Sequence, residues 1–600
     1  MSRDHDLALE EQFAQKRMSQ ATFLRLMRYI WPYRKRFALN LIFTVLATAS
    51  SLLGPKLIQV GIDRHLTDFT SAPAASWGIF VVSLIYLGNL LLGWFLSIGQ
   101  VTSAIAIGQR AMNDLRLAVF QHIQRLSLNY FDKTHQGRII SRADSDISAL
   151  DNVLTWGGNQ LLSSILTLLG AIVILVQYDW RLCLAVSGVL PFLAVGTRLF
   201  HINVMKAYRK MIEQGSRVTS ALAENISGVR VVQAFSREEE NLSRFSKIHA
   251  LYAESVRAAA RIFHTYMPFV ALLSGLGTTI ILGYGGALAL RQEITVGELA
   301  AFILYLGMFF GPIQTMGDLY NSVMSAAASA ERIFQLLDTQ PQILNRPDAT
   351  ALPPVRGHIV FEHVFFRYDT TPPEQWVLRD VSFEAKPGET VALVGATGSG
   401  KTTIISLVAR FYEAHQGRIL TDGLDLQRTT VESLRSQIGI VTQENFLFTG
   451  TVMENLKFGR PSATDEAVIE AARTLGTHDI ILKLENGYET KVAERGNNLS
   501  GGERQLITFT RAMVARPRIL ILDEATSAVD SHTEAIIQYA LEKLFERRTC
   551  FVVAHRLSTV RTAHQILVLQ NGEILERGNH DQLVAQGGHY AKLYEEFVRQ

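Results

Sequence analysis

Residues 391–402 read Val-Ala-Leu-Val-Gly-Ala-Thr-Gly-Ser-Gly-Lys-Thr, and this stretch decides the fold of the C-terminal half. Its four leading apolar residues predict a buried strand, and the rest matches a phosphate-binding loop that opens a helix. Glycines let backbone amides curl around phosphates, and the helix N-terminus adds a favourable dipole. Lys401 is expected to reach the β- and γ-phosphates, and the Thr402 hydroxyl to bind Mg²⁺. The pattern therefore predicts an α/β P-loop NTPase domain with ATP and Mg²⁺ as cofactors, in which the nucleotide-binding residues are Gly395, Thr397, Gly398, Ser399, Gly400, Lys401, Thr402 and Thr403.

A second apolar run, residues 519–522, ends in two acids, Asp523 and Glu524. In a parallel sheet the ends of both strands meet at one crevice, so both acids are expected near the phosphate-binding loop. Asp523 is suited to hold the water shell of Mg²⁺, and Glu524 to polarise the attacking water as general base. A helix N-cap is the alternative interpretation, and it accounts for one acid but not for two.

A second glycine turn lies at residues 499–505, Leu-Ser-Gly-Gly-Glu-Arg-Gln, where it too opens a predicted helix. The N-terminus of a helix favours anions. Because one phosphate chain needs only one such loop, the second loop implies either a second ligand or a second subunit.

The N-terminal half has a different composition. The chain has 600 residues, too many for one core, and it combines a mean hydropathy of +0.15 with 19% charged residues. Such a combination is typical of a membrane part joined to a water-soluble part. Six stretches are long and apolar enough to cross a bilayer as helices, a number that isolated buried helices do not explain. They are residues 37–59, 76–99, 158–178, 182–205, 266–290 and 297–317.

Lysine and arginine set the orientation of these spans. Five lie in residues 20–36, six between spans two and three, and ten between spans four and five, whereas the other connections hold little more than Arg64, Arg181 and Arg291. Both termini are therefore predicted to be cytoplasmic. The expected organisation is a cytoplasmic N-terminal segment (1–36), a transmembrane domain (37–338), a linker (339–356) and a nucleotide-binding domain (357–600).

The two inner connections have helical patterning, so the spans are expected to continue as helices beyond the membrane. Each has a break near its middle, at residues 129–137 and 225–228, where Gly137 and Gly228 suit turns. Short helices at these breaks are predicted to dock onto another domain. Solvated helical hairpins are the alternative.

Several functional classes are excluded. A net charge of +3 without a basic stripe argues against nucleic acid as a partner, and two cysteines give neither a disulfide framework nor metal-ligand spacing. The charged first thirty residues do not have the pattern of a secretory signal peptide. We expect the first apolar run to act as an uncleaved anchor.

Residues 499–505 resemble the signature of the ATP-binding cassette (ABC) transporter family. In that family the signature completes the ATP site of the opposite subunit, which implies this role for Ser500, Gly501, Gly502 and Gln505. The resemblance also implies that Tyr368 stacks on adenine and that Gln443 contacts Mg²⁺ and the attacking water. Asp530, in Ser-Ala-Val-Asp, matches the loop that links the two sites, and His555 matches the histidine on the γ-phosphate.

The membrane half resembles the exporter branch, in which six spans precede one cassette. The matching stretches are residues 130–142, 231–235, 329–333 and 490–496. In the last one, Lys491 and Ala493 depart from the usual Glu and Gly, so only Glu494 is carried over. The resemblance implies an ATPase that exports lipids or hydrophobic and amphipathic compounds by alternating access, in a bacterial cytoplasmic (inner) membrane.

The resemblance also implies a second half-transporter as partner. A homodimer is the simplest expectation because every catalytic element is intact, and a heterodimer with a degenerate partner site stays open. Two other functional classes also stay open, an importer on the same scaffold and a regulatory or channel protein that uses ATP only for gating. Intact Glu524 and His555 favour turnover over the last of these.

Overall fold

The computed structural model describes residues 20–66, 72–372, 374–523, 531–553 and 557–599. The chain divides into two compact units. The helical unit comprises Met1–Gln124 and Gly137–Thr339, and the sheet unit comprises Arg125–Gln136 and Gln340–Gln600. Residues 125–136 interrupt the helical unit in sequence and belong to the sheet unit. Glu524, Asp530 and His555 lie outside the described residues.

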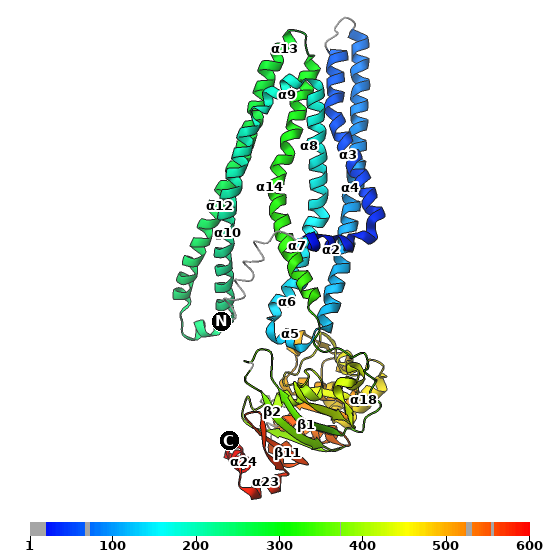
Figure 1. Cartoon of the computed structure of the whole chain (residues 1–600), viewed down its shortest axis with the longest axis vertical. Helices are drawn as coiled ribbons and strands as arrows, with labels where there is room; N and C mark the ends of the chain where they lie inside the picture. Colours follow the sequence, from blue (N-terminus) through cyan, green and yellow to red (C-terminus); the bar gives the residue numbers. More distant parts are fainter. Residues whose placement is uncertain (1–19, 67–71, 373, 524–530, 554–556, 600) are drawn as a thin grey trace. The chain divides into compact units, whose positions relative to one another are not determined.

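The helical unit contains six helical segments long and apolar enough to span a membrane, which confirms the predicted six-helix membrane region. The long helices run well beyond the apolar stretches: α4 has 54 residues and α12 has 43. The helices of this unit (Figure 1) are α2 (Gln20–Ile30), α3 (Arg34–Gly61), α4 (Ala72–Arg125), α6 (Gln136–Ala143), α7 (Ser145–Asp151), α8 (Gly158–Tyr178), α9 (Trp180–Ser187), α10 (Leu190–Ser227), α11 (Val229–Ala234), α12 (Glu238–Ile280), α13 (Gly286–Leu290) and α14 (Val296–Asp338).

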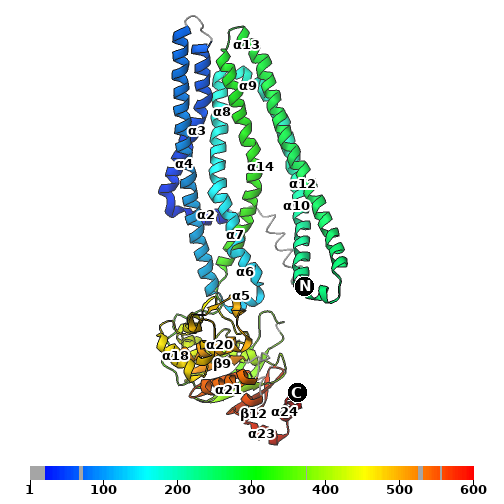
Figure 2. The same ribbon diagram turned by 180° about the vertical axis from the view of Figure 1, so that it is seen from behind.

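Two helix pairings organise this unit. Helices α10 and α12 lie side by side over much of their length, as both views show (Figures 1 and 2), while α14 packs against α3 and α8. A buried cluster that includes Leu182, Val270 and Phe302 joins α9, α12 and α14. Large apolar side chains such as Phe95 and Leu184 are exposed on the outer surfaces, as expected of helices that face lipid.

Local sequence signals set several helix starts. Asp179 caps α9 by accepting hydrogen bonds from the backbone N–H groups of Arg181 (2.7 Å) and Leu182 (3.2 Å). Thr295 and Glu298 form a reciprocal capping box at the start of α14. Each cap satisfies backbone donors that the first helical turn leaves unpaired.

The sheet unit is an α/β domain, as predicted. Its six-stranded sheet has the order β12-β11-β3-β10-β9-β6, and a four-stranded sheet has the order β2-β1-β4-β5. In the larger sheet, β11, β3, β10, β9 and β6 pair in parallel, and β12 is antiparallel to β11. All five residues of β3 and of β10 are buried, as expected for parallel strands covered on both faces.

The strands are β1 (Ile359–Phe366), β2 (Leu378–Ala385), β3 (Thr390–Val394), β4 (Gln416–Thr421), β5 (Leu424–Asp425), β6 (Ile438–Val441), β7 (Gly450–Thr451), β8 (Lys491–Val492), β9 (Ile519–Asp523), β10 (Thr549–Val553), β11 (Gln565–Gln570) and β12 (Glu573–Gly578). The helices are α5 (Leu128–Lys133), α15 (Lys401–Val408), α16 (Val431–Arg435), α17 (Val452–Lys457), α18 (Asp465–Thr474), α19 (His478–Leu482), α20 (Gly501–Val514), α21 (Ser531–Phe545), α22 (Leu557–Arg561), α23 (His580–Gln586) and α24 (His589–Arg599). Buried side chains of α20 and α21, such as Phe509 and Leu541, pack with Leu520 and Val552 of the sheet.

Candidate nucleotide site

Four parallel strands end at one edge of the larger sheet. Val553 of β10 pairs with Leu393 of β3 on one side and with Asp523 of β9 on the other, and Leu522 pairs with Val441 of β6. The phosphate-binding loop follows β3, the stretch with Gln443 follows β6, and Asp523 is the last residue of β9. Parallel strand ends form the usual ligand crevice of such sheets. The register therefore brings Asp523 to the same edge as the loop.

The backbone of the loop needs its glycines. Gly398 and Gly400 have φ values of +83° and +106°, a region that side chains disfavour. A Cβ atom on Gly400 would also lie 2.6 Å from Leu378 Cδ2. The curled loop leads directly into α15, where Lys401 Nζ donates hydrogen bonds of 2.8 Å to the carbonyls of Gly395 and Ala396.

The loop also contains an unsatisfied polar group. The Ser399 side chain is buried, and its Oγ has no hydrogen-bond partner among the described residues. A buried hydroxyl without a partner is costly, and a phosphate oxygen is a fitting acceptor for it. The loop therefore fits the phosphate chain of a nucleotide, as its sequence pattern predicts.

The site contains a cationic side chain, Lys401, suited to phosphate and an acidic one, Asp523, suited to a metal cation. Burial lowers the pKa of Lys401, and the nearby carboxylate of Asp523 acts in the opposite direction, which places these two side chains within electrostatic range. Thr402 is exposed at the first turn of α15, whereas Thr403 is buried. Gln443 is exposed just after β6. The arrangement leaves Thr402, Gln443 and Asp523 as the candidate Mg²⁺ ligands.

Tyr368 lies in an aromatic cluster beside α15. Its ring meets those of Phe366 and Tyr412 edge to face, at centroid distances of 4.9 and 5.1 Å, and its hydroxyl lies 3.0 Å from Thr403 Oγ1. Burial raises the pKa of Tyr368, so the phenol is neutral at physiological pH. These contacts fix the ring next to the phosphate-binding helix, and its stacking on adenine stays a prediction.

The signature stretch begins α20. Ser500 Oγ accepts a hydrogen bond from the Glu503 amide (3.2 Å), and Glu503 Oε2 accepts one from the Ser500 amide (2.7 Å). Arg504 Nη1 donates to the carbonyls of Gly496 and Leu499 and so fixes the preceding turn. Gly501 is half-buried and Gly502 buried. Gln505 is buried too, and its Oε1 has no hydrogen-bond partner in the described part of the chain.

Arg511 joins α20 to the segment that carries Gln443. Its Nε donates to the carbonyl of Asn455 (2.9 Å) and its Nη1 to the carbonyl of Phe446 (3.0 Å). Burial lowers the pKa of Arg511 to about 10, so the guanidinium still carries its charge at pH 7. The sequence interpretation missed this residue, and its one signal is a basic residue on the otherwise buried face of α20.

Sequence models of two families match the chain: the ABC transporter transmembrane region over residues 37–313, and the ABC transporter (ATP-binding) model over residues 378–527. An uncharacterised ABC transporter ATP-binding protein of Bacillus subtilis, YknV, is 40% identical over 97% of this chain and 96% of its own length. The chain belongs to the ABC transporter family. It carries one transmembrane region and one ATP-binding domain, so it is a half-transporter of the exporter type, an integral membrane protein and an ATPase coupled to transport.

Other ABC transporters are also similar over most of the chain. The ATP-dependent lipid A-core flippase of Syntrophus aciditrophicus is 35% identical over 96% of this chain and 94% of its own length. A fatty acid ABC transporter ATP-binding/permease protein of Mycobacterium tuberculosis is 39% identical over 81% of this chain and 76% of its own. The solved structure of a bacterial Atm1-family ABC exporter with ATP bound has a TM-score of 0.77, with 28% identity, 94% coverage of this chain and 98% of its own.

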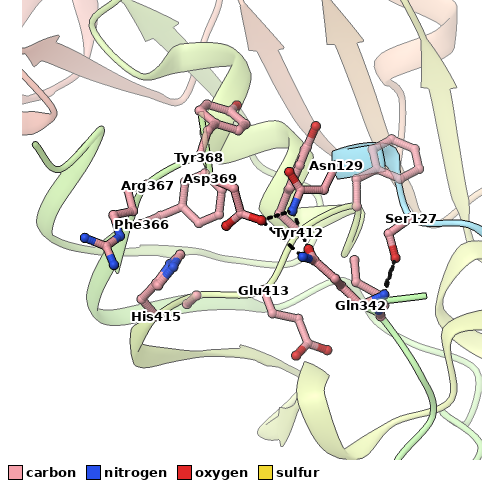
Figure 3. Close-up of a pocket in the computed structure, with 13 residues that line it drawn as sticks. Ser127, Asn129, Gln342, Phe366, Arg367, Tyr368, Asp369, Tyr412, Glu413 and His415 are labelled. Atoms are coloured by element: carbon pink, nitrogen blue, oxygen red, sulfur yellow. Dashed lines mark hydrogen bonds between the residues drawn. The ribbon is translucent and has the colours of Figure 1, made fainter. Parts of the chain in front are cut away.

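Residues 125–136, called the first inner turn below, belong to the sheet unit and form a polar cluster with its other residues (Figure 3). The Asp369 carboxylate accepts hydrogen bonds from Asn129 Nδ2 (2.5 Å), Lys133 Nζ (2.7 Å) and Gln342 Nε2 (3.1 Å). These bonds, Lys133 foremost, hold the pKa of Asp369 well below its usual range. Ser127 Oγ accepts from the amides of Gln342 (2.9 Å) and Ile343 (3.0 Å).

A cavity of about 180 Å³ lies beside this cluster, between α5 and the segments around Tyr368 and Tyr412. The Tyr412 hydroxyl donates to Asp132 at the other end of α5. Asp369, which binds the first inner turn, thus directly follows the predicted adenine-stacking Tyr368 in the sequence. The sequence interpretation predicted that a short helix docks at this break, but it did not identify Asp369, Gln342 or Tyr412 as partners.

Proposed function

We propose that two copies of this half-transporter pair and, driven by ATP, move lipids or other hydrophobic and amphipathic compounds outward by alternating access. One observation carries the proposal: the chain contains both a phosphate-binding loop and a separate signature, and each has a buried polar atom, Ser399 Oγ or Gln505 Oε1, without a hydrogen-bond partner among the described residues. Half-transporter ABC exporters function as dimers. In a site shared between two chains, the phosphate-binding loop of one chain faces the signature of the other, and the bound nucleotide lies between them.

Each residue of the proposed shared site has a role. Residues 395–403 hold the phosphates, Tyr368 stacks on adenine, and Thr402, Gln443 and Asp523 hold Mg²⁺. When bound, ATP supplies the free energy of phosphoryl transfer to water. Glu524 orients and deprotonates that water, His555 contacts the γ-phosphate, and Asp530 links the two sites. From the opposite chain, the signature places Ser500, Gly501, Gly502 and Gln505 on the phosphates.

Complementation between two inactive variants tests the shared site. Lys401→Ala damages only the phosphate-binding loop, and Ser500→Arg damages only the signature. Each homodimer should be inactive. If sites form between chains, a mixed dimer contains one intact site, because the loop of the Ser500→Arg chain faces the signature of the Lys401→Ala chain. If each site lies within one chain, every site in the mixed dimer carries one damaged element. Tagged, co-purified mixed dimers without ATPase activity would contradict the shared site.

The base is tested separately. Glu524→Gln should abolish steady-state hydrolysis while ATP binding persists, because the amide keeps the shape and loses the basic oxygen. Glu546→Gln is the matched control, since it makes the same change in an exposed surface carboxylate that pairs with Lys543. Undiminished turnover in Glu524→Gln would remove this residue as the base.

The chain's partner is proposed to be a second copy of itself. Native mass spectrometry of the purified chain should show a dimer with ATPase activity. A monomer without activity would instead favour a heterodimer with a second, different chain.

The cargo and its direction rest on the relatives and on the charge pattern. Relatives are named for lipid A-core, for fatty acids and for multidrug efflux, which favours a lipid or hydrophobic compound as cargo. The arginine- and lysine-rich inner connections favour a cytoplasmic location of both termini and of the ATPase domain, and the bacterial relatives favour the inner membrane. ATP-driven uptake of lipids, dyes and peptides into inside-out vesicles tests both; loss of cargo from those vesicles would indicate import.

A further inference from the structure

A cavity of about 670 Å³ opens between α10 and α12 of the helical unit, and no motif of the family accounts for it. The two helices run side by side here (Figures 1 and 2). The size lies in the range of small-molecule sites. Its lining is apolar toward one end, with Leu199, Phe200 and Phe269, and cationic toward the other, with Lys206, Lys210 and Arg261.

The apolar end is built by close packing between the helices. The rings of Phe200 and Tyr266 stack at 4.1 Å between centroids, with 13° between their planes, and Tyr266 Oη lies 3.0 Å from Thr197 Oγ1. A Cβ atom on Gly196 would lie 2.2 Å from the ring of Phe269, so the glycine is what lets that ring lie against α10. Both helices thereby contribute aromatic surface to one fixed wall.

The lining of the cavity contains no carboxylate; the acids next to it in sequence on these helices are Glu213, which pairs with Arg217, and Glu254. Among the described residues, Lys206, Lys210 and Arg261 form no ion pair, and the sequence contains no Asp or Glu in residues 190–212 or 255–280. Arg209 and Arg257 add further positive charge on the same helices. Cations gathered without a carboxylate attract an anion, and low-dielectric walls strengthen that attraction.

The two ends of the cavity follow the membrane boundary that the sequence predicts. Predicted spans 182–205 and 266–290 end at residue 205 and begin at residue 266, and the three cations lie just outside these limits. The apolar wall therefore lies at lipid depth and the cations at the predicted inner interface. Lysines at a span end also orient the helix or cover apolar surface with their stems. Neither role requires three of them to line one cavity with aromatic rings.

We propose that this cavity binds a single-chain anionic amphiphile, a long-chain fatty acid anion, with its chain along Phe200 and Phe269 and its carboxylate on Lys206, Lys210 and Arg261. Binding there would make the cavity a holding site for exported cargo, and this part of the inference rests on the proposed function. The polarity of the cavity sets the orientation of the ligand, with the head group toward the predicted cytoplasmic side.

Photolabelling of the full-length protein tests the proposal without nucleotide. The probe is palmitate with a diazirine in its chain, applied to the transporter in phosphatidylcholine nanodiscs, and labelled peptides are mapped by mass spectrometry. Labels are expected in residues 193–210 and 258–270. Unlabelled palmitate should compete at least tenfold better than its methyl ester, which keeps the chain and loses the charge, and inorganic phosphate should not compete.

Variants of the lining residues distinguish a loss of binding caused by lost charge from one caused by a disturbed structure. The pair Lys206→Gln and Lys210→Gln should weaken palmitate binding at least tenfold, and Lys206→Arg with Lys210→Arg should restore it. Arg209→Gln is the matched control, because it removes the same charge from the same helix without lining the cavity. Ala207→Phe should reduce labelling by filling the cavity while leaving all cations in place.

Two outcomes would overturn the proposal. The first is equal competition by palmitate and its methyl ester, and the second is unchanged labelling of the two segments in the Lys206→Gln, Lys210→Gln variant. Because the assay contains no ATP, it is independent of the complementation test. Failure of complementation with intact palmitate binding would remove the shared ATP site alone. Active mixed dimers without palmitate binding would remove this site alone.

Discussion

The two inner turns of the helical region differ in what covers them. The first, residues 125–136, is tied to the sheet unit: Asn129 is only 7% exposed, and Asp369 accepts hydrogen bonds from both Asn129 and Lys133. The second, residues 225–237, displays its apolar side chains. Val231 is 61% exposed and Phe235 is 73% exposed, and α11 has no buried residue.

This difference leaves the apolar side chains of the second turn exposed among the described residues. Clustered apolar side chains on a turn of this kind mark an interaction surface. The sequence predicts that both breaks dock onto another domain, and we infer that the exposed apolar side chains of the second turn form its docking surface.

The largest expected effect comes from the second turn. Phe235→Asp should lower ATPase activity more than tenfold while ATP still binds to the loop, because burial of a phenylalanine contributes about 2–3 kcal/mol and a carboxylate resists burial. Leu242→Asp, at an exposed position of α12 beyond the turn, is the matched control and should retain activity. Wild-type turnover in Phe235→Asp would mean that the second turn docks on nothing.

A smaller effect is expected at the first turn. Asp369→Asn should speed hydrogen exchange of residues 126–134 by about three- to tenfold, because the exposed charge-assisted bonds it removes contribute about 1 kcal/mol together. Glu384→Gln, which alters a surface carboxylate paired with His358, is the control. If exchange in α5 stays at the wild-type rate, Asp369 is not what holds the first turn.

These two turns also show how far the sequence could be read. Four apolar residues before Gly395 were enough to predict the central strand, and hydropathy was enough for six spans. Asn129 and Asp369 are 240 residues apart, and no local pattern links such positions. Lys206 and Lys210 were counted as orientation charges, because helix pairing alone decides that they line a cavity. The roles of Glu524, Asp530 and His555 stay predictions.

The stability of the first turn is expected to depend on pH through two side chains, Asp369 and His415. The pKa of Asp369 is lowered in the folded protein, so its contribution is complete above the ordinary value near pH 4 and is lost only as pH falls below that value. Burial lowers the pKa of neighbouring His415, so the unfolded state takes up its proton first and stability falls as pH drops through about 6.5. The second turn has neither group.

Hydrogen exchange of α5, corrected for the intrinsic pH dependence, separates these two contributions. Any loss of protection between pH 7 and 5 should disappear in His415→Gln, and the remaining profile should be flat down to about pH 4. A decline near pH 6 that persists in His415→Gln and disappears when Asp369→Asn is added would show that Asp369 is not held ionised by Lys133.

The smallest expected effect concerns the hydroxyl of Tyr412. It donates to Asp132, and burial, then Asp132 itself, raises its pKa, so it stays a donor throughout the physiological range. Tyr412→Phe keeps the ring, which meets Phe366 at 5.6 Å, and removes only this bond. The expected cost is about 0.5–1 kcal/mol, or two- to fivefold faster exchange in α5. Asp132→Ala should add nothing in a Tyr412→Phe background, since the two residues act through one bond. Additive effects of the two substitutions would mean that Asp132 holds the turn by another contact.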